Sequence, residues 1–335
     1  MARHVTLDMT LDELLGLSEL APYQRYMVYA PSHVSASELP ISGIRQRPLS
    51  AVAELGWSPE AIREGMEALM DAADEGRVSL HHVYEDADDP VMRDVSLIRL
   101  APADLDPTRP FVLLCSGGAY KNVCNIAEGI TVGRHVVEAG LQAYLLTYRV
   151  SVPEVLPHAL DDVGAALAWM SRHGDELAVD VERYAIAGFS AGGNLACTWG
   201  LPHVGFRAHG MPAPQAILAA YACVDLELES RRNDAHGMLP RMFGEAWRGR
   251  MGAYDVVTNA GGDYPTCYIV CGRNDALLSC AHSEALKRRL DAVGVAAVLE
   301  ECEDAPHGFG DGTGTDAHGW PERALAFLSG LDDRR

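Results

Sequence analysis

Basic residues are scarce in this chain of 335 residues. Lys and Arg total 27 against 47 Asp and Glu, which gives a formal net charge of −20. A surface with this charge repels phosphate backbones and anionic lipid, so we expect neither nucleic acid nor a membrane as a partner. The excess acid also keeps a protein soluble.

Long apolar runs and a secretion signal are missing as well. No uninterrupted apolar stretch approaches the roughly 20 residues that a membrane helix needs, and no apolar core follows Arg3 as it would in a signal peptide. The eight cysteines form no Cys-x-x-Cys pair, and several fall in apolar strand-like runs. These absences predict reduced, buried thiols in a cytoplasmic protein.

What is present is an alternation of apolar runs and helix-length segments from about residue 78 onwards. The expected strands are Val91–Leu100, Phe111–Cys115, Ala143–Tyr148, Tyr184–Phe189, Gln215–Ala222, Thr266–Cys271 and Ala296–Cys302. The expected helices are Asn125–Ala139, Leu156–His173, Ala191–Leu201 and Ser279–Val293. This rhythm predicts an α/β domain over residues 78–335, with a mostly parallel central sheet and helices on both faces.

Two regions depart from the alternation. Residues 1–77 carry helix signals over Thr10–Leu20 and from Ser58, a candidate N-cap followed by Pro59. This accessory segment could cap the active site, form a dimer arm in a homo-oligomer, or pack on the core. Residues 223–264 are too long for a simple connection and resemble a lid.

An apolar stripe within the second region suggests a substrate contact. It includes Met242, Phe243 and Trp247, and such a soft face could close over a substrate. Core packing explains the same spacing and stays open.

The sequence Gly188-Phe189-Ser190-Ala191-Gly192 lies between an expected strand and an expected helix. A serine on such a sharp turn is typical of a hydrolase nucleophile. The turn forces strained dihedrals on Ser190, and glycine at 188 and 192 removes Cβ atoms that would clash. An ordinary glycine-rich turn is the bland alternative.

A serine hydroxyl needs a base to remove its proton. In the fold type with this turn the order along the chain is serine, acid, histidine. His307 follows the last expected strand, where ligands meet a parallel sheet. His318 is the weaker candidate, and His282 lies too early in that order.

The acid should follow the strand before that histidine. Asp275 stands in the Gly-led turn after Thr266–Cys271, where a carboxylate would orient the imidazole. Asp275 could instead cap the next helix, and Asp225 is the runner-up acid.

An oxyanion hole is expected in the loop Ser116-Gly117-Gly118-Ala119-Tyr120. We predict the backbone N–H groups of Gly118 or Ala119, together with that of Ala191, as its donors. Tyr120 is a further candidate for substrate contact. A plain tight turn remains the alternative.

Taken together, these motifs resemble the α/β-hydrolase esterases of the hormone-sensitive-lipase-like and acetyl-esterase group, from about residue 91 to 330. Further matching segments are Glu128-Gly129, Tyr148-Arg149-Val150, Pro157–Val163, Tyr264-Pro265-Thr266, His307–Gly310 and Gly319-Trp320. The resemblance implies the α/β-hydrolase fold, hydrolysis of short-acyl carboxylic esters, no cofactor, and the triad Ser190, Asp275 and His307. Many relatives have His-Gly-Gly-Gly where this chain has Ser116–Ala119, and residues 1–77 match nothing in the group.

The predicted function is therefore a serine esterase that acts on a small-molecule ester, with acetylated sugars as the first substrate candidate. A peptidase or amidase, an acyltransferase, and a non-catalytic binding protein on the same scaffold remain as rivals. No metal site is expected, because the adjacent His81 and His82 would point to opposite faces of a strand.

Overall fold

A single eight-stranded sheet organises the computed structural model, which describes residues 5–39, 41–232 and 237–332. The strands lie in the order β1-β2-β4-β3-β5-β6-β7-β8. Their bounds are β1 Val78–His82, β2 Ser96–Leu100, β3 Phe111–Cys115, β4 Ala143–Thr147, β5 Tyr184–Phe189, β6 Ala216–Ala220, β7 Thr266–Gly272 and β8 Ala297–Cys302. The strand β2 pairs antiparallel with both β1 and β4, and the other strands pair in parallel. The prediction of a mostly parallel sheet is confirmed.

The register of the parallel strands places the site. Cys115 at the end of β3 pairs with Gly188 of β5, and Gly272 at the end of β7 pairs with Cys302 of β8. The loops that follow these four strands therefore leave the same edge of the sheet. Strands β3 to β6 are buried along their whole length, which is why their sequences are apolar throughout.

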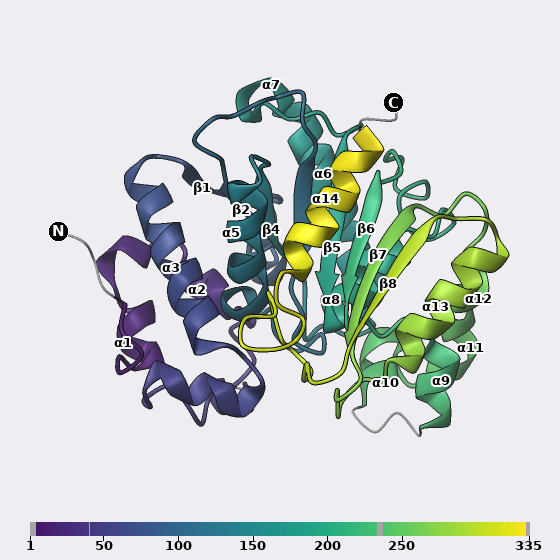
Figure 1. Cartoon of the computed structure of the whole chain (residues 1–335), viewed down its shortest axis with the longest axis horizontal. Coiled ribbons are helices and arrows are strands. Elements are labelled where there is room, and N and C mark those ends of the chain that lie inside the picture. Colours follow the sequence, from purple (N-terminus) through teal and green to yellow (C-terminus); the bar gives the residue numbers. More distant parts are fainter. Residues whose placement is uncertain (1–4, 40, 233–236, 333–335) are drawn as a thin grey trace.

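Helices cover both faces of the sheet, as expected. Figure 1 shows α5 (Ile130–Glu138) and α14 (Trp320–Asp332) in front of the strands, and α6 (Val155–Arg172) and α8 (Ser190–Trp199) behind them. The pairs α5–α14 and α6–α8 are in contact, and α13 (Ala281–Ala292) packs against β7 and β8. A π-helical turn, η4 (Asn125–Gly129), leads into α5, and the short α7 (Gly174–Leu177) follows α6.

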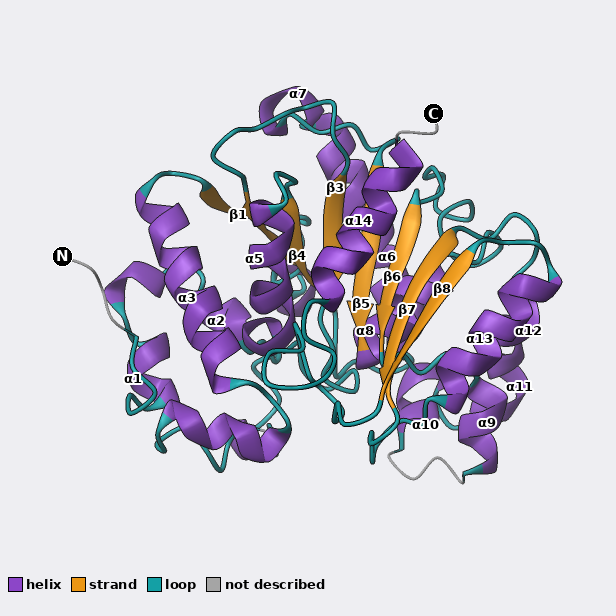
Figure 2. Cartoon of the chain, in the orientation of Figure 1, coloured by secondary structure: helices purple, strands orange, loops and turns teal. Residues whose placement is uncertain are grey.

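The N-terminal segment forms a helical layer beside α5 (Figure 2). Its elements are α1 Leu11–Leu15, η1 Ser18–Leu20, α2 Gln24–Met27, η2 Ala36–Glu38, η3 Leu49–Leu55 and α3 Pro59–Asp74. Ser58 caps α3 as predicted, because its hydroxyl accepts a hydrogen bond from the N–H of Ala61 at 3.2 Å. Helix α3 packs against α5 and so joins the segment to the α/β domain.

Near the first edge of the sheet, the strand predictions were incomplete in one place and wrong in another. His81 and His82 lie on an edge strand, β1, as the sequence indicated, but no bounds were predicted for it because its polar residues do not form an apolar run. The strand expected from Val91 begins only at Ser96, since Pro90 opens the short helix α4 (Pro90–Arg93).

The described parts of the lid-like insertion, residues 223–232 and 237–264, contain short helices beyond the carboxyl ends of the strands. They are α9 Leu226–Arg231, α10 Met238–Phe243, α11 Trp247–Arg250, η5 Met251–Ala253 and α12 Val256–Asn259. Within the described ranges, no helix combines the length and the apolar character needed to cross a bilayer.

Candidate active site

Ser190 stands where β5 ends and α8 begins. Its backbone has φ +52°, in the left-handed region that non-glycine residues rarely adopt, and its side chain lies at the carboxyl edge of the sheet. Such strain is typical of functional residues held by their surroundings. The predicted sharp turn is present.

The glycines beside Ser190 are required by close backbone contacts. A Cβ at Gly188 would overlap the backbone of Gly192, and a Cβ at Gly192 would overlap the carbonyl oxygen of Cys115. The second contact brings the start of α8 against the end of β3. The glycines therefore allow the serine turn and the loop after β3 to lie side by side.

The structure brings His307 and Asp275 to Ser190. The Nε2 atom of His307 lies 2.9 Å from the Oγ of Ser190, and its Nδ1 lies 2.7 Å from Oδ2 of Asp275. The other carboxylate oxygen of Asp275 accepts hydrogen bonds from the N–H groups of Leu277 and Leu278, at 2.8 and 2.7 Å. Asp275 is thus the partner of the histidine and also closes its own turn, but it does not cap the next helix: α13 has Cys280 at its N-cap position, so that alternative was wrong.

The rival residues lie elsewhere. Asp225 caps α9, accepting a hydrogen bond from the N–H of Leu228 at 2.8 Å. His318 is exposed ahead of α14. On β1, the ring of His81 lies tilted against that of Trp169, with centroids 4.9 Å apart, whereas Nδ1 of His82 bonds to the carbonyl of Arg93 at 2.9 Å. The two histidines have separate partners, as expected for opposite faces of an edge strand.

The loop after β3 has the backbone geometry of a donor site. Gly118, Ala119 and Tyr120 all have positive φ, at +134°, +54° and +57°. In the part of the chain that the structure describes, the N–H groups of Gly118 and Ala119 donate to no protein acceptor. The N–H of Ala191 belongs to the first turn of α8, where helical N–H groups have no partner within the helix. These three groups were the predicted oxyanion donors.

With this geometry in place, comparison with known protein families gives one decisive match. Residues 116–311 match the model of the family described as alpha/beta hydrolase fold. The chain belongs to this family. The match includes Ser190, Asp275 and His307 and stops short of the N-terminal segment.

Named relatives of this chain include "Probable carboxylic ester hydrolase LipM" of Mycobacterium tuberculosis, 29% identical over 211 residues, 58% of this chain and 48% of LipM. Hormone-sensitive lipase of Mus musculus is 28% identical over 130 residues, 39% of this chain and 17% of the lipase. The chain thus matches about half or less of the length of these relatives. Among solved structures, the acetyl ester-xyloside bifunctional hydrolase from Caldicellulosiruptor lactoaceticus superposes with a TM-score of 0.62 at 20% identity, covering 77% of this chain and 96% of that one, which shows the shared fold.

Two cavities include Ser190 in their walls. The first has a volume of about 320 Å³, and its wall includes Ser190, His307 and Gly118, with Leu55 and Trp57 from the N-terminal segment. Residues 1–77 therefore supply part of the wall around the nucleophile. No local motif predicted this, because the two residues reach the site only through the docking of their segment.

The second cavity has a volume of about 360 Å³ and is walled by the lid-like insertion. Its lining includes Lys121, Glu229, Met238 and Arg241. The Nε of Arg241 donates to the carbonyl of Ala119 at 3.1 Å, which fastens α10 to the loop after β3. A search for apolar spacing missed the polar members of this lining, Lys121, Glu229 and Arg241.

The four residues predicted to contact substrate do not line either cavity. Met242 and Phe243 are fully buried, in a helix that packs against α6, and Trp247 is 7% exposed. Tyr120 is also fully buried, with its hydroxyl donating to Oδ1 of Asn194 at 2.7 Å. The substrate-contact prediction is corrected: these side chains pack in the core, which was the alternative left open for the stripe.

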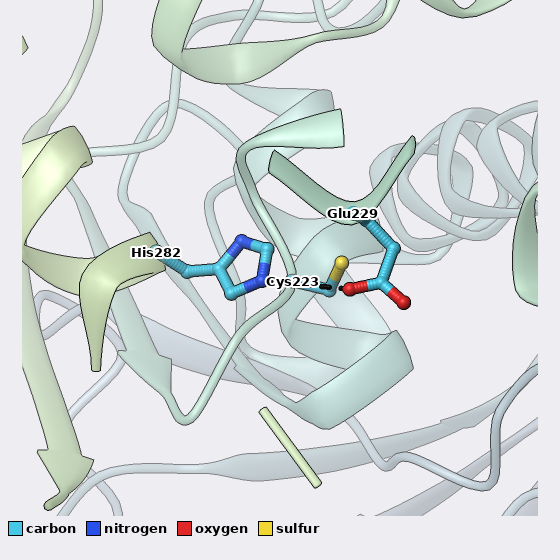
Figure 3. A group of neighbouring side chains, drawn as sticks. All are labelled: Cys223, Glu229 and His282. Carbon is cyan, nitrogen blue, oxygen red and sulfur yellow. Dashed lines mark ion pairs between the residues drawn. The ribbon is translucent and has the colours of Figure 1, made fainter. Parts of the chain in front are cut away.

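Cys223, Glu229 and His282 gather beside the second cavity, and all three are buried (Figure 3). Their N, O and S atoms are of the kinds that bind metals. However, Nδ1 of His282 accepts a hydrogen bond from the N–H of Asp225 at 3.2 Å, so the neutral ring carries its proton on Nε2. That nitrogen lies 3.8 Å from Oε2 of Glu229. We therefore describe the group as a buried imidazole–carboxylate pair that supports the cavity wall.

A disulfide joins Cys271 at the end of β7 to Cys280 just before α13. The expectation that all eight cysteines are reduced was wrong for this pair, because the turn that carries Asp275 folds back and brings two thiols together across nine positions. The other six cysteines are free and buried, as predicted. The bond closes the loop on which Asp275 stands.

Reduction of this disulfide should loosen the Asp275 loop. In the chain-entropy model a cross-link of this span contributes about 2.5 kcal/mol, or a shift in melting temperature of roughly 4 °C for a chain of this size. We expect dithiothreitol to lower the melting temperature of the native chain and to leave that of a Cys271→Ser/Cys280→Ser variant unchanged. Equal sensitivity of both proteins to the reductant would contradict the assignment.

Proposed function

We propose that this chain is a serine hydrolase that cleaves carboxylic esters with short acyl groups through an acyl-enzyme intermediate. The observation that carries the proposal is the chain of contacts from Ser190 Oγ to His307 Nε2 at 2.9 Å and from His307 Nδ1 to Asp275 at 2.7 Å. A buried carboxylate that accepts from Nδ1 keeps Nε2 free to take the serine proton. The esterase names of the matched relatives favour ester chemistry.

The reaction would proceed in two stages. Ser190 Oγ attacks the ester carbonyl as His307 takes its proton, and the resulting oxyanion is bound by the N–H groups of Gly118 or Ala119 and of Ala191. The tetrahedral intermediate collapses, and the alcohol leaves with the proton from His307. Water then loses a proton to the same imidazole, attacks the acyl-serine, and releases the acid.

The cavities support a small acyl group and a polar alcohol. Each is of the size of a small-molecule site, at about 320 and 360 Å³. The second places Lys121, Glu229 and Arg241 beside the apolar Met238, Leu277 and Leu278, so it offers polar partners for hydroxyl groups next to an apolar surface. Acetylated sugars therefore remain the first substrate candidate.

The test compares a p-nitrophenyl ester series with the matching anilide. We expect the acetate and butyrate to be hydrolysed, the octanoate to be hydrolysed much more slowly, and a fluorophosphonate probe to label Ser190. Faster cleavage of the anilide would indicate an amidase, and diversion of the acyl group to an added alcohol an acyltransferase. Absence of both turnover and labelling would indicate a binding protein and would overturn the proposal.

A further inference from the structure

A buried carboxyl that the reaction above does not use lies behind the nucleophile. Glu128 belongs to the π-helical turn η4, a kind of turn that is frequent at functional sites. It is 4% exposed, and it shares the wall of the first cavity with Ser190 and His307.

The carboxyl of Glu128 contacts the loop that carries the oxyanion donors. Its Oε2 accepts a hydrogen bond from the N–H of Gly117, the residue before Gly118. A Cβ at Gly117 would lie 2.8 Å from Cβ of Ser190 and 3.2 Å from Oε2 of Glu128. The carboxyl of Glu128 and the side chain of Ser190 therefore both lie next to the Cα atom of Gly117.

The other carboxyl oxygen leads to the histidine loop. Oε1 of Glu128 accepts from the hydroxyl of Tyr221 at 3.0 Å, and that hydroxyl accepts from the N–H of Gly310 at 3.3 Å. The ring of Tyr221 also lies edge-on to the ring of His307, with centroids 5.1 Å apart. Tyr221 is itself held at φ +39°, an unusual conformation for a bulky residue. One carboxyl thus links the loop of Gly117 to the loop of His307.

The charge of Glu128 is sensitive to pH near neutrality. Burial raises the pKa of its carboxyl to about 7, and this rise is opposed by the Gly117 N–H, the nearby His307 and the Tyr221 hydroxyl. Burial also raises the pKa of Tyr221 well above its usual value, so its hydroxyl remains a donor. The ionisable groups that surround the carboxyl or share its cavity are Tyr221, His307, Cys124, Tyr148, Lys121 and Glu38.

A neutral side chain of the same shape would suffice to tie two loops together. Removing a carboxyl from water costs several kcal/mol unless its charge or its hydrogen bonds compensate. The histidine becomes positively charged when it takes the serine proton, and a nearby buried negative charge stabilises that form. A carboxylate at this position would therefore stabilise the protonated histidine, which a neutral side chain that only packs between the loops would not do.

We propose that Glu128 is a positioning residue that aligns the oxyanion loop with the His307 loop through Gly117 and Tyr221, and that its negative charge stabilises the protonated histidine. The inference rests on the proposed function, since it concerns the same reaction. Glu128 would act through these neighbours and would form no bond to the substrate.

The decisive variant is Glu128→Gln, which keeps the shape and the Gly117 acceptor but removes the charge. We expect kcat for p-nitrophenyl acetate to fall about 10- to 100-fold, because a nearby opposite charge shifts a pKa by about 1 to 2 units and each unit is tenfold in the stability of the protonated histidine, with KM changed less than about twofold. The ratio of wild-type to variant kcat should rise with pH up to about 7 and then stay level. Below that pH the wild-type carboxyl is itself neutral, so the two proteins should converge.

Stability gives a readout that does not depend on activity. The folded-state pKa of Glu128 is raised, so its contribution to stability is fully present below the ordinary carboxyl pKa of 4.5 and is lost as the pH rises through about 7. As the pH rises between these two values, the melting temperature of Glu128→Gln should therefore increase relative to that of the wild type. A constant difference would contradict the buried ionisation.

Tyr221→Phe tests the same link from its other end. It removes the hydroxyl between Glu128 and Gly310, and the double variant with Glu128→Gln should be no worse than the poorer single variant. Without this donor the pKa of the Glu128 carboxyl should rise further, so the pH-dependent fall in the melting temperature of Tyr221→Phe should move to higher pH. This second criterion decides the matter even if Glu128→Gln does not fold.

The outcomes separate the two proposals. If the wild type cleaves esters and Glu128→Gln matches it at every pH, or shows a deficit that does not vary with pH, the positioning role is overturned and the serine hydrolase stands. If the wild type shows neither ester cleavage nor probe labelling, the proposed function itself is overturned.

Discussion

Ser190→Ala is expected to lower kcat for p-nitrophenyl acetate by about 10⁴- to 10⁶-fold, the range found when a serine nucleophile is removed from an intact triad. The reason is local. The lost oxygen is the atom 2.9 Å from Nε2 of His307, whereas the cavity wall and the oxyanion donors remain. Substrate binding should change little, so KM should stay within a fewfold of the wild-type value.

A matched change is available in α14. Ser329→Ala makes the same chemical substitution at a half-buried helix position outside the cavities at Ser190, and it should leave kcat unchanged. Both variants should unfold within about 2 °C of the wild type, because each loses only one hydroxyl. Ester cleavage by Ser190→Ala at more than about a hundredth of the wild-type rate would remove Ser190 as the nucleophile.

The three side chains at the nucleophile could be predicted because each one follows a buried parallel strand. Ser190, Asp275 and His307 come after β5, β7 and β8, and the carboxyl ends of parallel strands meet at one edge of a sheet. Because each short motif follows such a strand, the motifs together predicted that the three side chains lie close to one another. The same reasoning located the loop that contains Gly118 and Ala119.

The surroundings of the site could not be predicted in the same way. Leu55 and Trp57 reach the first cavity because α3 docks on α5, a contact between segments that share no motif. The stripe in α10 has a helical period, but the period does not say which neighbour the apolar face meets. The structure places Met242 toward the core, while Met238 lies in the wall of the second cavity.

The path of the backbone in two loops determines side-chain positions that could not be predicted from residue types alone. Three successive positive φ values from Gly118 direct the ring of Tyr120 into the core, where Asn194 accepts from its hydroxyl. The turn after β7 likewise brings Cys271 and Cys280 together. Both outcomes depend on chain direction in a loop, which a pattern of residue types leaves undetermined.

Asp275→Asn should lower kcat by about 10⁴-fold, as the corresponding change does in a serine protease triad. The hydrogen bonds within the turn of Asp275 determine how an asparagine side chain would be oriented there. Two backbone N–H groups, from Leu277 and Leu278, point at one side-chain oxygen at 2.8 and 2.7 Å. An asparagine would therefore place its carbonyl oxygen there and turn its NH₂ group toward His307.

That orientation would invert the histidine tautomer. Nδ1 of His307 would have to accept from the amide, so the proton of the neutral ring would sit on Nε2, the nitrogen that faces Ser190 Oγ. The imidazole would then be unable to take the serine proton. Asp275→Ala should be as inactive and also less stable by about 1 kcal/mol, because it leaves the two N–H groups without their cap.

Asp225→Asn is the matched control, because Asp225 likewise accepts a hydrogen bond from a nearby backbone N–H group, there at the start of α9, and also follows a strand of the same sheet. It should keep kcat within about twofold of the wild type, since its carboxylate contacts Leu228 and not His307. The measurement is kcat for p-nitrophenyl acetate, with thermal unfolding of each variant. Full activity in Asp275→Asn together with a large loss in Asp225→Asn would exchange the roles of the two acids, and the histidine would then have to move to reach its partner.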